Sequence, residues 1–507
     1  MKSVRPRRVR HFSLWLCSLL LGFAYLPRIA TAQTTAPLAH EKPVIAAITA
    51  GGVDATIPAL FISDIHFDPF HDPARVSQLV AAQVSQWGSI LSRPPSPNQP
   101  KTFTALQQTC NARGVDTPYT LLRSSLRAMR ARQPDARFML VSGDLIAHDF
   151  SCRYKTLFPH ATPAEYQSFV EKTIRYMVGQ LRATFPRIPI YVALGNNDSA
   201  CGDYRLDPGN NFLADTARIM ATGLPASDRA AEIHDFSQAG SYSLTMAPPM
   251  QNTRLIVLDD LFLSKKYRSC SGQHDPAPAD AEIAWLRDQL EQARQSGQRV
   301  WVMGHIPTGI DPYATARRLG AMCGHVHPVM FLSSTKLADL LIEYADIIRL
   351  GIFAHTHMDE IRLLQLEPAE PNSASPAVAI KMVPSISPVD GNDPSFTIAR
   401  ISPLTATLQD YKVVSASNHT GIATRWSVEY DFAQTFHQQQ FSPSTVRALI
   451  AEFADPGADT AVSQQYIRHY FIGDRSSELK PFWPQYVCAL ANHTVEAYSA
   501  CICLKAK

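Results

Sequence analysis

Residues of the kinds that bind metal ions follow apolar runs at five points of the chain. Their side chains are carboxylates, imidazoles and one carboxamide, with no thiolate among them. The candidate ligands are Asp64, His66, Asp144, Asn196, His305, His355 and His357. This donor set suits borderline or hard divalent cations such as Zn, Mn or Fe. One such motif alone is more often a loop or a helix cap, but five in succession predict a metal site.

Two of these motifs, D-x-H and H-x-H, separate their ligand residues by a single position. Side chains two positions apart on an extended segment point the same way. We therefore expect Asp64 and His66 to converge on a cation, and His355 and His357 to do the same. This expectation assumes an extended backbone at both motifs.

Apolar runs typical of buried strands precede the motifs and alternate with helix-like segments. The expected strands are 59–63, 137–142, 188–194, 253–259, 299–304 and 348–354, and the expected helices are 119–133, 163–183 and 280–297. Further strand-like segments at 377–383, 396–402, 406–414 and 425–432 are expected to add an antiparallel part to the sheet. The alternation predicts an α/β sandwich with ligands at the strand ends.

In this order the motifs D-x-H, G-D, G-N, G-H and H-x-H resemble the calcineurin-like metallophosphoesterase superfamily. The strings SDIHFDP, GDLIAHD, GHIPTG and HTHMDE are similar to those of its acid sphingomyelinase-like phosphodiesterase branch. The resemblance spans roughly residues 58–410. It implies a four-layer αββα sandwich with mixed sheets, a helical C-terminal region, and hydrolysis of phosphodiester or phosphoanhydride bonds. The lead-in before the first motif is too short for the saposin domain that acid sphingomyelinase carries.

The resemblance also assigns the ligands to two divalent cations, with Zn expected and Mn or Fe as alternatives. One cation would be held by Asp64, His66 and His357. The other would be held by Asn196, His305 and His355. Asp144 would bridge the two, since a carboxylate offers one oxygen to each. Such a pair of cations activates a water as hydroxide for attack on phosphorus and clamps the phosphoryl oxygens.

Asn197 departs from the pattern of the family, which usually has histidine at this position. A carboxamide donates a hydrogen bond to a phosphoryl oxygen but cannot protonate a leaving alkoxide. His148 matches the histidine of the branch's GD…AHD string and is therefore the predicted general acid, with Asn197 as the predicted phosphate contact. The change at Asn197 favours anhydride, nucleotide or activated diester substrates over sphingomyelin.

Other interpretations stay open at this point. The string GNND is also a favourable turn sequence. The string CGHVHP contains His325 and His327 in the more usual G-H-x-H form, but it follows no strand-like segment, so His355 and His357 are preferred. The enzymatic alternative is a phosphomonoesterase. The non-enzymatic alternative is a catalytically weak, metal-binding surface module.

Residues near the motifs are candidates for supporting roles. Asp68 and Asp359 are expected either to orient ligand histidines or to be solvated loop charges. Tyr204, with Lys265 or Lys266, would meet a phosphate-bearing ligand if its segment shapes the substrate cleft rather than a plain surface loop.

The N-terminus predicts export to the periplasm or secretion. A basic stretch precedes an apolar run at 12–26, and ATA precedes Gln33, as in a signal peptide that is cleaved after Ala32. The alternative is a membrane anchor, for which the run is short. Residues 1–32 hold six of the 47 basic residues and no acidic ones, so 41 basic and 44 acidic residues follow. We therefore expect no nucleic-acid patch and no transmembrane segment after cleavage.

We expect four segments along the chain. These are the signal peptide (1–32), a loose lead-in (33–57), the catalytic domain (58–435) and a helical, cysteine-containing C-terminal region (436–507). Eight cysteines follow residue 32, which indicates disulfides in an exported protein. Cys488 is expected to pair with Cys501 or Cys503. The expected substrate is a small phosphate ester, a phosphoanhydride or a lipid headgroup.

Overall fold

The computed structural model describes residues 55–316, 328–366, 375–454 and 460–505. The strands of this part are β1 (Ile57–Ile62), β2 (Met139–Val141), β3 (Ile190–Val192), β4 (Tyr242–Thr245), β5 (Thr253–Val257), β6 (Arg299–Met303), β7 (Ile348–Phe353), β8 (Ile361–Gln365), β9 (Ala377–Met382), β10 (Ser395–Ser402), β11 (Thr407–Ala416) and β12 (Trp426–Asp431).

These strands form two mixed, six-stranded sheets. The first has the order β12-β11-β10-β1-β2-β3, and the second has the order β4-β5-β6-β7-β9-β8. In the first sheet β1, β2 and β3 run parallel, and β10 pairs antiparallel with β1. In the second sheet β5, β6, β7 and β9 run parallel between antiparallel edge strands. The parallel strands bring five motif loops to the carboxyl ends of their sheets, where open sheets place their ligands.

The helices of the N-terminal and central parts are α1 (Val76–Ala81), α2 (Trp87–Leu91), α3 (Gln99–Thr109), α4 (Tyr119–Arg132), α5 (Phe150–Leu157), α6 (Pro163–Thr184), α7 (Asn211–Met220), α8 (Arg229–Ala239), α9 (Ala277–Gln295), α10 (Pro312–Ala316) and α11 (Lys336–Glu343). The C-terminal helices are α12 (Phe432–Phe436), α13 (Pro443–Phe453), α14 (Ala461–Tyr470), α15 (Ser476–Leu479), α16 (Trp483–Ala491) and α17 (Val495–Lys505).

The two sheets pack face to face, with helices on the outer faces. The Trp301 ring of β6 meets the rings of Phe61 and Phe138 edge-on, with centroids 6.2 and 5.9 Å away, which joins the sheets through aromatic contacts. Helices α9, α11, α13 and α16 pack on strands of the second sheet. Helix α4 lies against the first sheet, where Trp426 Nε1 donates to Ser124 Oγ at 2.9 Å. The predicted αββα sandwich is thus confirmed.

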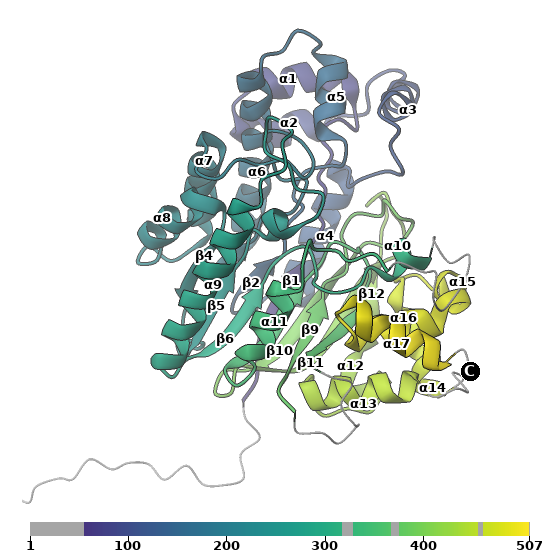
Figure 1. Ribbon diagram of the computed structural model, residues 1–507. Helices are drawn as coiled ribbons and strands as arrows, with labels where there is room; N and C mark the ends of the chain where they lie inside the picture. The colour runs from purple at the N-terminus through teal and green to yellow at the C-terminus, as the bar shows by residue number, and fades with distance from the viewer. Residues whose placement is uncertain (1–54, 317–327, 367–374, 455–459, 506–507) are drawn as a thin grey trace, which may run out of the picture. The chain divides into compact units, whose positions relative to one another are not determined.

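Two groups of helices extend this sandwich. Helices α1, α2, α3 and α5 lie together at the top of Figure 1, and the C-terminal helices, drawn in light green to yellow, lie at the lower right. Helices α13 and α16 contact β8, so the helical C-terminal region covers that edge of the second sheet. Among the helices that the structure describes, none is both long and apolar enough to cross a bilayer.

The elements predicted from the sequence occur with small shifts of their ends. The prediction that four later segments form one antiparallel part of the sheet is only half right. Strands β10, β11 and β12 form the expected antiparallel part, but β9 belongs to the second sheet and runs parallel to β7. Strands β4 and β8 were not predicted. In β8 the buried Arg362 interrupts the apolar pattern, and its charge is met by Glu360, 3.2 Å away.

Three disulfides link described cysteines: Cys110–Cys152, Cys201–Cys270 and Cys488–Cys501. The expected pairing of Cys488 is therefore confirmed, with Cys501 as the partner, and Cys503 forms no disulfide with another described cysteine. Cys323, the predicted signal peptide, and the alternative histidines His325 and His327 lie outside the described residues.

Candidate metal centre

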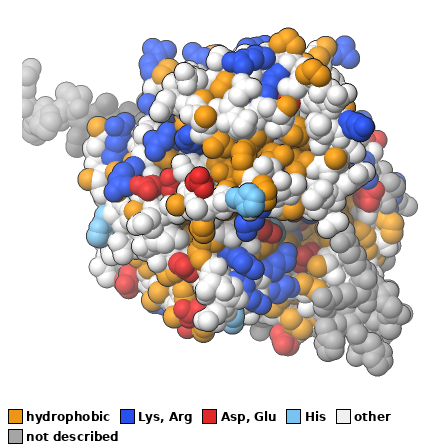
Figure 2. All heavy atoms as spheres, turned by 90° about the horizontal axis from the view of Figure 1, so that it is seen from above, with side chains coloured by type: hydrophobic (Ala, Val, Ile, Leu, Met, Phe, Trp, Pro, Cys, Tyr) orange, Lys and Arg blue, Asp and Glu red, His pale blue; other side chains and the backbone are white. Residues whose placement is uncertain are grey.

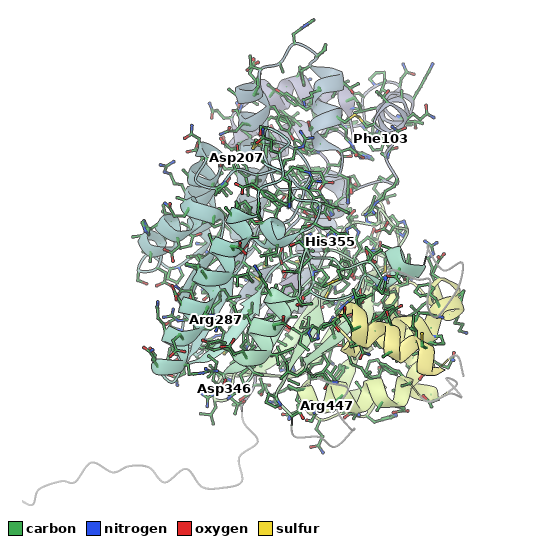
Figure 3. The ribbon with its side chains drawn as sticks, viewed as in Figure 1. Phe103, Asp207, Arg287, Asp346, His355 and Arg447 are labelled. Carbon is green, nitrogen blue, oxygen red and sulfur yellow. A yellow bond between two sulfur atoms is a disulfide. The ribbon has the colours of Figure 1, made fainter. Side chains whose placement is uncertain are left out.

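All seven predicted ligands lie in loops that follow parallel strands of the two sheets. The loops after β1, β2 and β3 come from the first sheet, and those after β6 and β7 come from the second. His355, labelled in Figure 3, lies above the upper ends of the strands in that view. The carboxyl ends of both sheets therefore meet at one place.

Three of the predicted ligands meet on one side of this place. His66 Nε2 lies 3.2 Å from His357 Nε2. Asp64 Oδ1 lies 3.3 Å from His357 Nε2 and 3.7 Å from His66 Nε2. All three side chains are buried. Donor atoms from β1 and β7 loops, far apart in the sequence, thus point at one another.

Asp144 joins this group to a second one. Its Oδ2 lies 3.4 Å from His66 Nε2 and 3.1 Å from His305 Nε2. The rings of His305 and His355 are next to each other, with centroids 5.3 Å apart. Asn196 Oδ1 is buried and has no hydrogen-bond partner among the described residues. A carboxylate therefore stands between two sets of nitrogen and oxygen donors.

The side chains of this centre include groups of His and Asp that could hold a metal ion. His66 Nδ1 lies 3.0 Å from the carbonyl oxygen of Ile146, and His305 Nδ1 lies 2.7 Å from that of Ser142. Donation from Nδ1 leaves the lone pair of Nε2 facing the centre, as in metal-ligating histidines. Within the described part of the chain, Asp64 Oδ1, Asn196 Oδ1 and His305 Nε2 have no hydrogen-bond donor of their own. Buried acceptors without donors fit a bound cation.

The electrostatics of the centre point the same way. Burial, the largest single influence, would lower the pKa of both His66 and His305, but the surrounding carboxylates, Asp144 foremost, together outweigh it and raise the two pKa values to about 9 and about 10. Burial would raise the pKa of Asp64, but His357 and His66 hold it well below its ordinary value. The carboxylates of Asp64 and Asp144 thus stabilise positive charge in the centre. Protons on the histidines supply this charge when no cation is bound.

The backbone at these ligands is left-handed rather than extended. Positive φ angles occur at five of them: Asp64 (44°), His66 (43°), Asp144 (55°), His355 (72°) and His357 (66°). The expectation of an extended D-x-H and H-x-H is therefore wrong. Each strand ends before its motif, and tight turns of left-handed residues aim the side chains instead. Such conformations are costly for residues other than glycine and cluster at functional sites.

Two glycines allow the loops after β2 and β3 to meet. Gly143 has a φ of +90°, and a Cβ there would lie 2.7 Å from Gly195 N. A Cβ on Gly195 would lie 2.2 Å from Asp144 Oδ1. Asp198 accepts hydrogen bonds from Gly195 N at 3.0 Å and Leu145 N at 2.8 Å, which ties the same loops together. The string GNND is therefore a turn, and it also presents Asn196 to the centre.

His148, the predicted general acid, lies at the edge of the first group. Its ring stacks on His66 with centroids 3.8 Å apart. Its Nδ1 lies 2.9 Å from Asp116 Oδ1, and its backbone N–H donates to Asp116 Oδ2 at 2.9 Å. Burial and the charge of His66 lower the pKa of His148 to about 4. Asp116 thus orients the imidazole, as in other carboxylate–histidine pairs.

Asn197 lies beside the shared carboxylate. Its backbone N–H donates to Asp144 Oδ1 and its Nδ2 donates to Asp144 Oδ2, both at 2.9 Å. The carboxamide therefore supports Asp144 in this structure and has one amide hydrogen left for another acceptor.

Several carboxylates that support the ligands were missed by sequence reasoning. Asp203 accepts from Asn196 Nδ2 at 2.7 Å, and Asp390 Oδ2 lies 3.2 Å from His357 Nδ1. Asp260 accepts from the backbone N–H of His305 at 2.8 Å. Asp116, described above, completes the set. They lie outside the motif strings, so no spacing in the sequence distinguished them from ordinary loop carboxylates.

The two carboxylates that were considered for this role have other partners. Asp68 Oδ2 accepts from the buried Arg153 at 2.8 Å. Asp359 pairs with the buried Lys381 and with the hydroxyl of Tyr430. The described contacts of both lead to these groups rather than to a ligand histidine. Arg153 also lies 3.6 Å from Asp116, so Asp68 acts on His148 only indirectly.

The model of the calcineurin-like phosphoesterase family matches residues 57–359. Cyclic GMP-AMP phosphodiesterase SMPDL3A from Mus musculus is 24% identical over 76% of this chain and 82% of its own. Acid sphingomyelinase-like phosphodiesterase 3b from Homo sapiens is 23% identical, over 87% and 89%. Sphingomyelinase phosphodiesterase C from Dictyostelium discoideum is 24% identical, over 65% and 69%.

Proposed function

Because the chain belongs to the calcineurin-like phosphoesterase family, in its acid sphingomyelinase-like branch, we propose that it is an exported phosphodiesterase with two divalent cations. The family makes it a metal-dependent phosphoric ester hydrolase, and its similarity to proteins named phosphodiesterases supports diesters rather than monoesters as substrates. One observation carries the proposal. The Asp144 carboxylate lies between two groups of buried donors, which supports its role as a bridge between two cations.

We assign the ligands as follows. One cation is held by Asp64, His66 and His357. The other is held by Asn196, His305 and His355. Asp144 is shared, and Zn is the proposed metal, with Mn or Fe as alternatives, because the donors are nitrogen and oxygen without sulfur. When bound, two such cations lower the pKa of a water and neutralise charge on the phosphoryl oxygens.

The residues around the cations complete the proposed chemistry. His148 gives a proton from Nε2 to the leaving oxygen, while Asp116 holds its Nδ1. This help matters most for poor leaving groups, whose departing oxygen needs a proton. Asn197 donates its remaining amide hydrogen to a phosphoryl oxygen. Its two contacts with Asp144 support a place beside the reacting phosphate.

The proposal extends to the organisation of the chain. Residues 58–435 form the catalytic domain and 436–507 the helical C-terminal region, while residues 1–32 direct export to the periplasm or secretion and are removed. The substrate is a nucleotide diester, a phosphoanhydride or a lipid headgroup. On the face shown in Figure 2, Lys and Arg side chains gather on either side of a central band of hydrophobic ones, which would attract an anionic substrate.

The test compares bis(p-nitrophenyl) phosphate with p-nitrophenyl phosphate. The protein is loaded with Zn or Mn, and its metal content is measured. We expect the wild-type protein to hydrolyse the diester and to bind about two metal ions per chain. The Asp144→Asn variant should lose both the turnover and the bound metal. Asp280→Asn, which removes an exposed carboxylate on α9, is the matched control. Turnover of the monoester alone would identify a phosphomonoesterase, and no turnover with two metals bound would identify a binding module.

A further inference from the structure

A cavity of about 770 Å³ lies beside helix α4. This volume is in the range of small-molecule sites. None of the seven proposed metal ligands lines the cavity, and neither do Asp116 and His148. Its walls come from α4, from the segments 68–75 and 91–99, and from residues 421–426, where β12 begins. A ligand in this cavity would therefore be separate from the phosphate ester that the cations are proposed to bind.

Helix α4 gives the cavity an excess of positive charge. The helix carries four arginines and no acidic residue. Three of them, Arg123, Arg127 and Arg132, line the cavity, and Arg93 joins them from the segment before α3. Like charges four positions apart, such as those of Arg123 and Arg127, destabilise a helix slightly. Helix stability therefore does not explain why these arginines are placed together.

Three of these cations are available to a ligand. Arg93, Arg123 and Arg127 are exposed, and none of them forms a salt bridge within the part of the chain that the structure describes. Arg93 Nη1 donates to the neutral Gln78 Oε1 at 2.8 Å, and the guanidinium of Arg123 lies 5.5 Å from the centroid of the Tyr119 ring. These contacts position the two side chains without neutralising their charge.

The two carboxylates in the wall of the cavity are already paired. Asp68 Oδ2 accepts from Arg153 Nη1 at 2.8 Å. Asp72 Oδ2 lies 3.0 Å from Arg75 Nε and accepts from the backbone N–H of Ser96 at 3.0 Å. The charge that remains in the cavity is therefore positive, and it suits an anionic group that accepts hydrogen bonds from guanidinium.

The remaining wall along α4 is elongated and lined by small side chains. Ser124, Ala128 and Ala131 lie on one face of the helix, and the lining runs from Thr120 to Ala131, about 16 Å along the axis. Ile422 lines the cavity from the opposite segment and is 65% exposed. Half of the hydrocarbon core of a bilayer, which one layer of acyl chains fills, is about 15 Å thick. The cavity therefore has the length of one acyl chain.

The segment that carries Ile422 is fixed on α4. Thr120 Oγ1 donates to the carbonyl of Thr420 at 2.5 Å. Gly421 lies so close to the helix that a Cβ at this position would be 2.3 Å from Leu121 Cα. Ile422 is therefore held at the cavity in an exposed position, where an apolar ligand would cover it.

We propose that this cavity binds the anion of a long-chain fatty acid. The carboxylate lies among Arg93, Arg123 and Arg127, and the chain lies along the small side chains of α4, against Ile422. This inference goes beyond the proposed function, because the ligand contains no phosphorus and is bound apart from the cations. A cationic amphiphile would meet the arginines and is disfavoured, while a short carboxylate lacks the chain that covers the apolar wall.

The test measures binding to the Zn-loaded full chain by calorimetry, with each amphiphile kept below its micelle concentration. Dodecanoate should bind more than tenfold more tightly than octanoate, because four more methylenes leave water. Dodecyltrimethylammonium should bind at least tenfold more weakly than dodecanoate. Arg127→Gln should weaken the binding of dodecanoate about tenfold, and Arg127→Lys should keep most of it. Arg130→Gln is the matched control, since Arg130 is on the same helix but does not line the cavity.

Two results would overturn the proposal directly. One is an equal loss of dodecanoate binding in Arg127→Gln and Arg130→Gln, which would indicate attraction to the net charge of α4 alone. The other is equal binding of the cationic and anionic amphiphiles. Unfolding temperatures of the variants show whether each one is folded.

A further arm separates the cavity from the metal centre, because a carboxylate can also bind Zn. Asp144→Asn, which should lose the metal, should keep its affinity for dodecanoate. Loss of dodecanoate binding in this variant, together with full binding in Arg127→Gln, would place the ligand at the cations and refute the cavity site. Failure of the wild-type protein to hydrolyse a diester would count against the proposed function and would leave the binding comparison intact.

Discussion

His66 and His357 face each other across the candidate metal centre with 3.2 Å between their Nε2 atoms. Two unprotonated nitrogens at this distance repel, so a proton or a cation must stand between them. The two carboxylates beside them, Asp64 and Asp144, strengthen this demand. The same atoms therefore bind protons or metal in competition.

The first prediction follows from this competition. Loading the metal-free protein with Zn at pH 7 should release protons, because the pKa of His66 is about 9 and that of His305 about 10 without a cation. Metal affinity should fall as the pH falls. Calorimetry in buffers of different ionisation enthalpy measures the number released. The metal affinity is measured at pH 8 and at pH 5. Equal affinities at the two pH values would show that these histidines are not ligands.

The second prediction concerns Gly195. Gly195→Ala should abolish metal binding and activity, because the new Cβ would lie 2.2 Å from Asp144 Oδ1. Gly179→Ala in helix α6 is the matched control, because no described atom beyond its chain neighbours and the nearby backbone of the helix lies within 4 Å of its Cβ position. That variant should keep activity and gain up to about 1 kcal/mol of unfolding free energy from helix propensity. Metal analysis and urea unfolding check both. Normal metal content in Gly195→Ala would contradict the tight approach of the loops.

The third prediction concerns Asp116, a positioning residue for His148. Asp116→Asn should lower kcat about 10²- to 10³-fold for diesters with alkyl leaving groups. It should have a much smaller effect on bis(p-nitrophenyl) phosphate, whose leaving group needs no proton. His148→Gln should show the same dependence, and the double variant should be no worse than either. Equal losses for good and poor leaving groups would mean a structural role only.

The fourth prediction concerns stability away from the centre. Glu232 in α8 is buried, neither of its oxygens has a hydrogen-bond partner among the described residues, and burial raises its pKa to about 8. The folded state therefore holds this proton more tightly than the unfolded state. The resulting stability is complete below the ordinary glutamate pKa and is lost as the pH rises through 8.

Glu232→Gln should remove this loss. Between pH 4 and pH 9 the unfolding free energy of the variant should therefore fall by about 2 to 4 kcal/mol less than that of the wild-type protein. Urea unfolding at both pH values gives the difference. If the two proteins lose stability in parallel, the carboxyl is ionised in the folded state after all.

The sequence predicted the main sheets and helices and the ligand candidates because these leave local patterns. Apolar runs marked β1, β2, β3, β6 and β7, and each one ends beside a polar motif. The pattern does not show how the chain turns after the strand. The left-handed φ angles at His66 and His357 result from packing between loops. The rule that side chains alternate along a strand takes no account of such packing.

The supporting residues could not be predicted for a similar reason. Asp116 meets His148 across 32 positions of chain, and Asp390 meets His357 only in the folded sandwich. Asp68 and Asp359 are next to the motifs in the sequence, yet they form ion pairs with Arg153 and Lys381. Proximity in sequence favoured the wrong carboxylates, because the partners of a buried charge are chosen by the packing of distant segments.

The distance between His66 and His357 along the chain also has a consequence for biogenesis. Their Nε2 atoms touch across 291 positions, and the loops between them come from both sheets. No fragment that emerges early in synthesis contains a complete set of donors. Metal uptake must therefore follow late, long-range steps of folding, which are slow because distant segments have to meet. A bound metal ion would then be a marker that the whole sandwich has closed correctly.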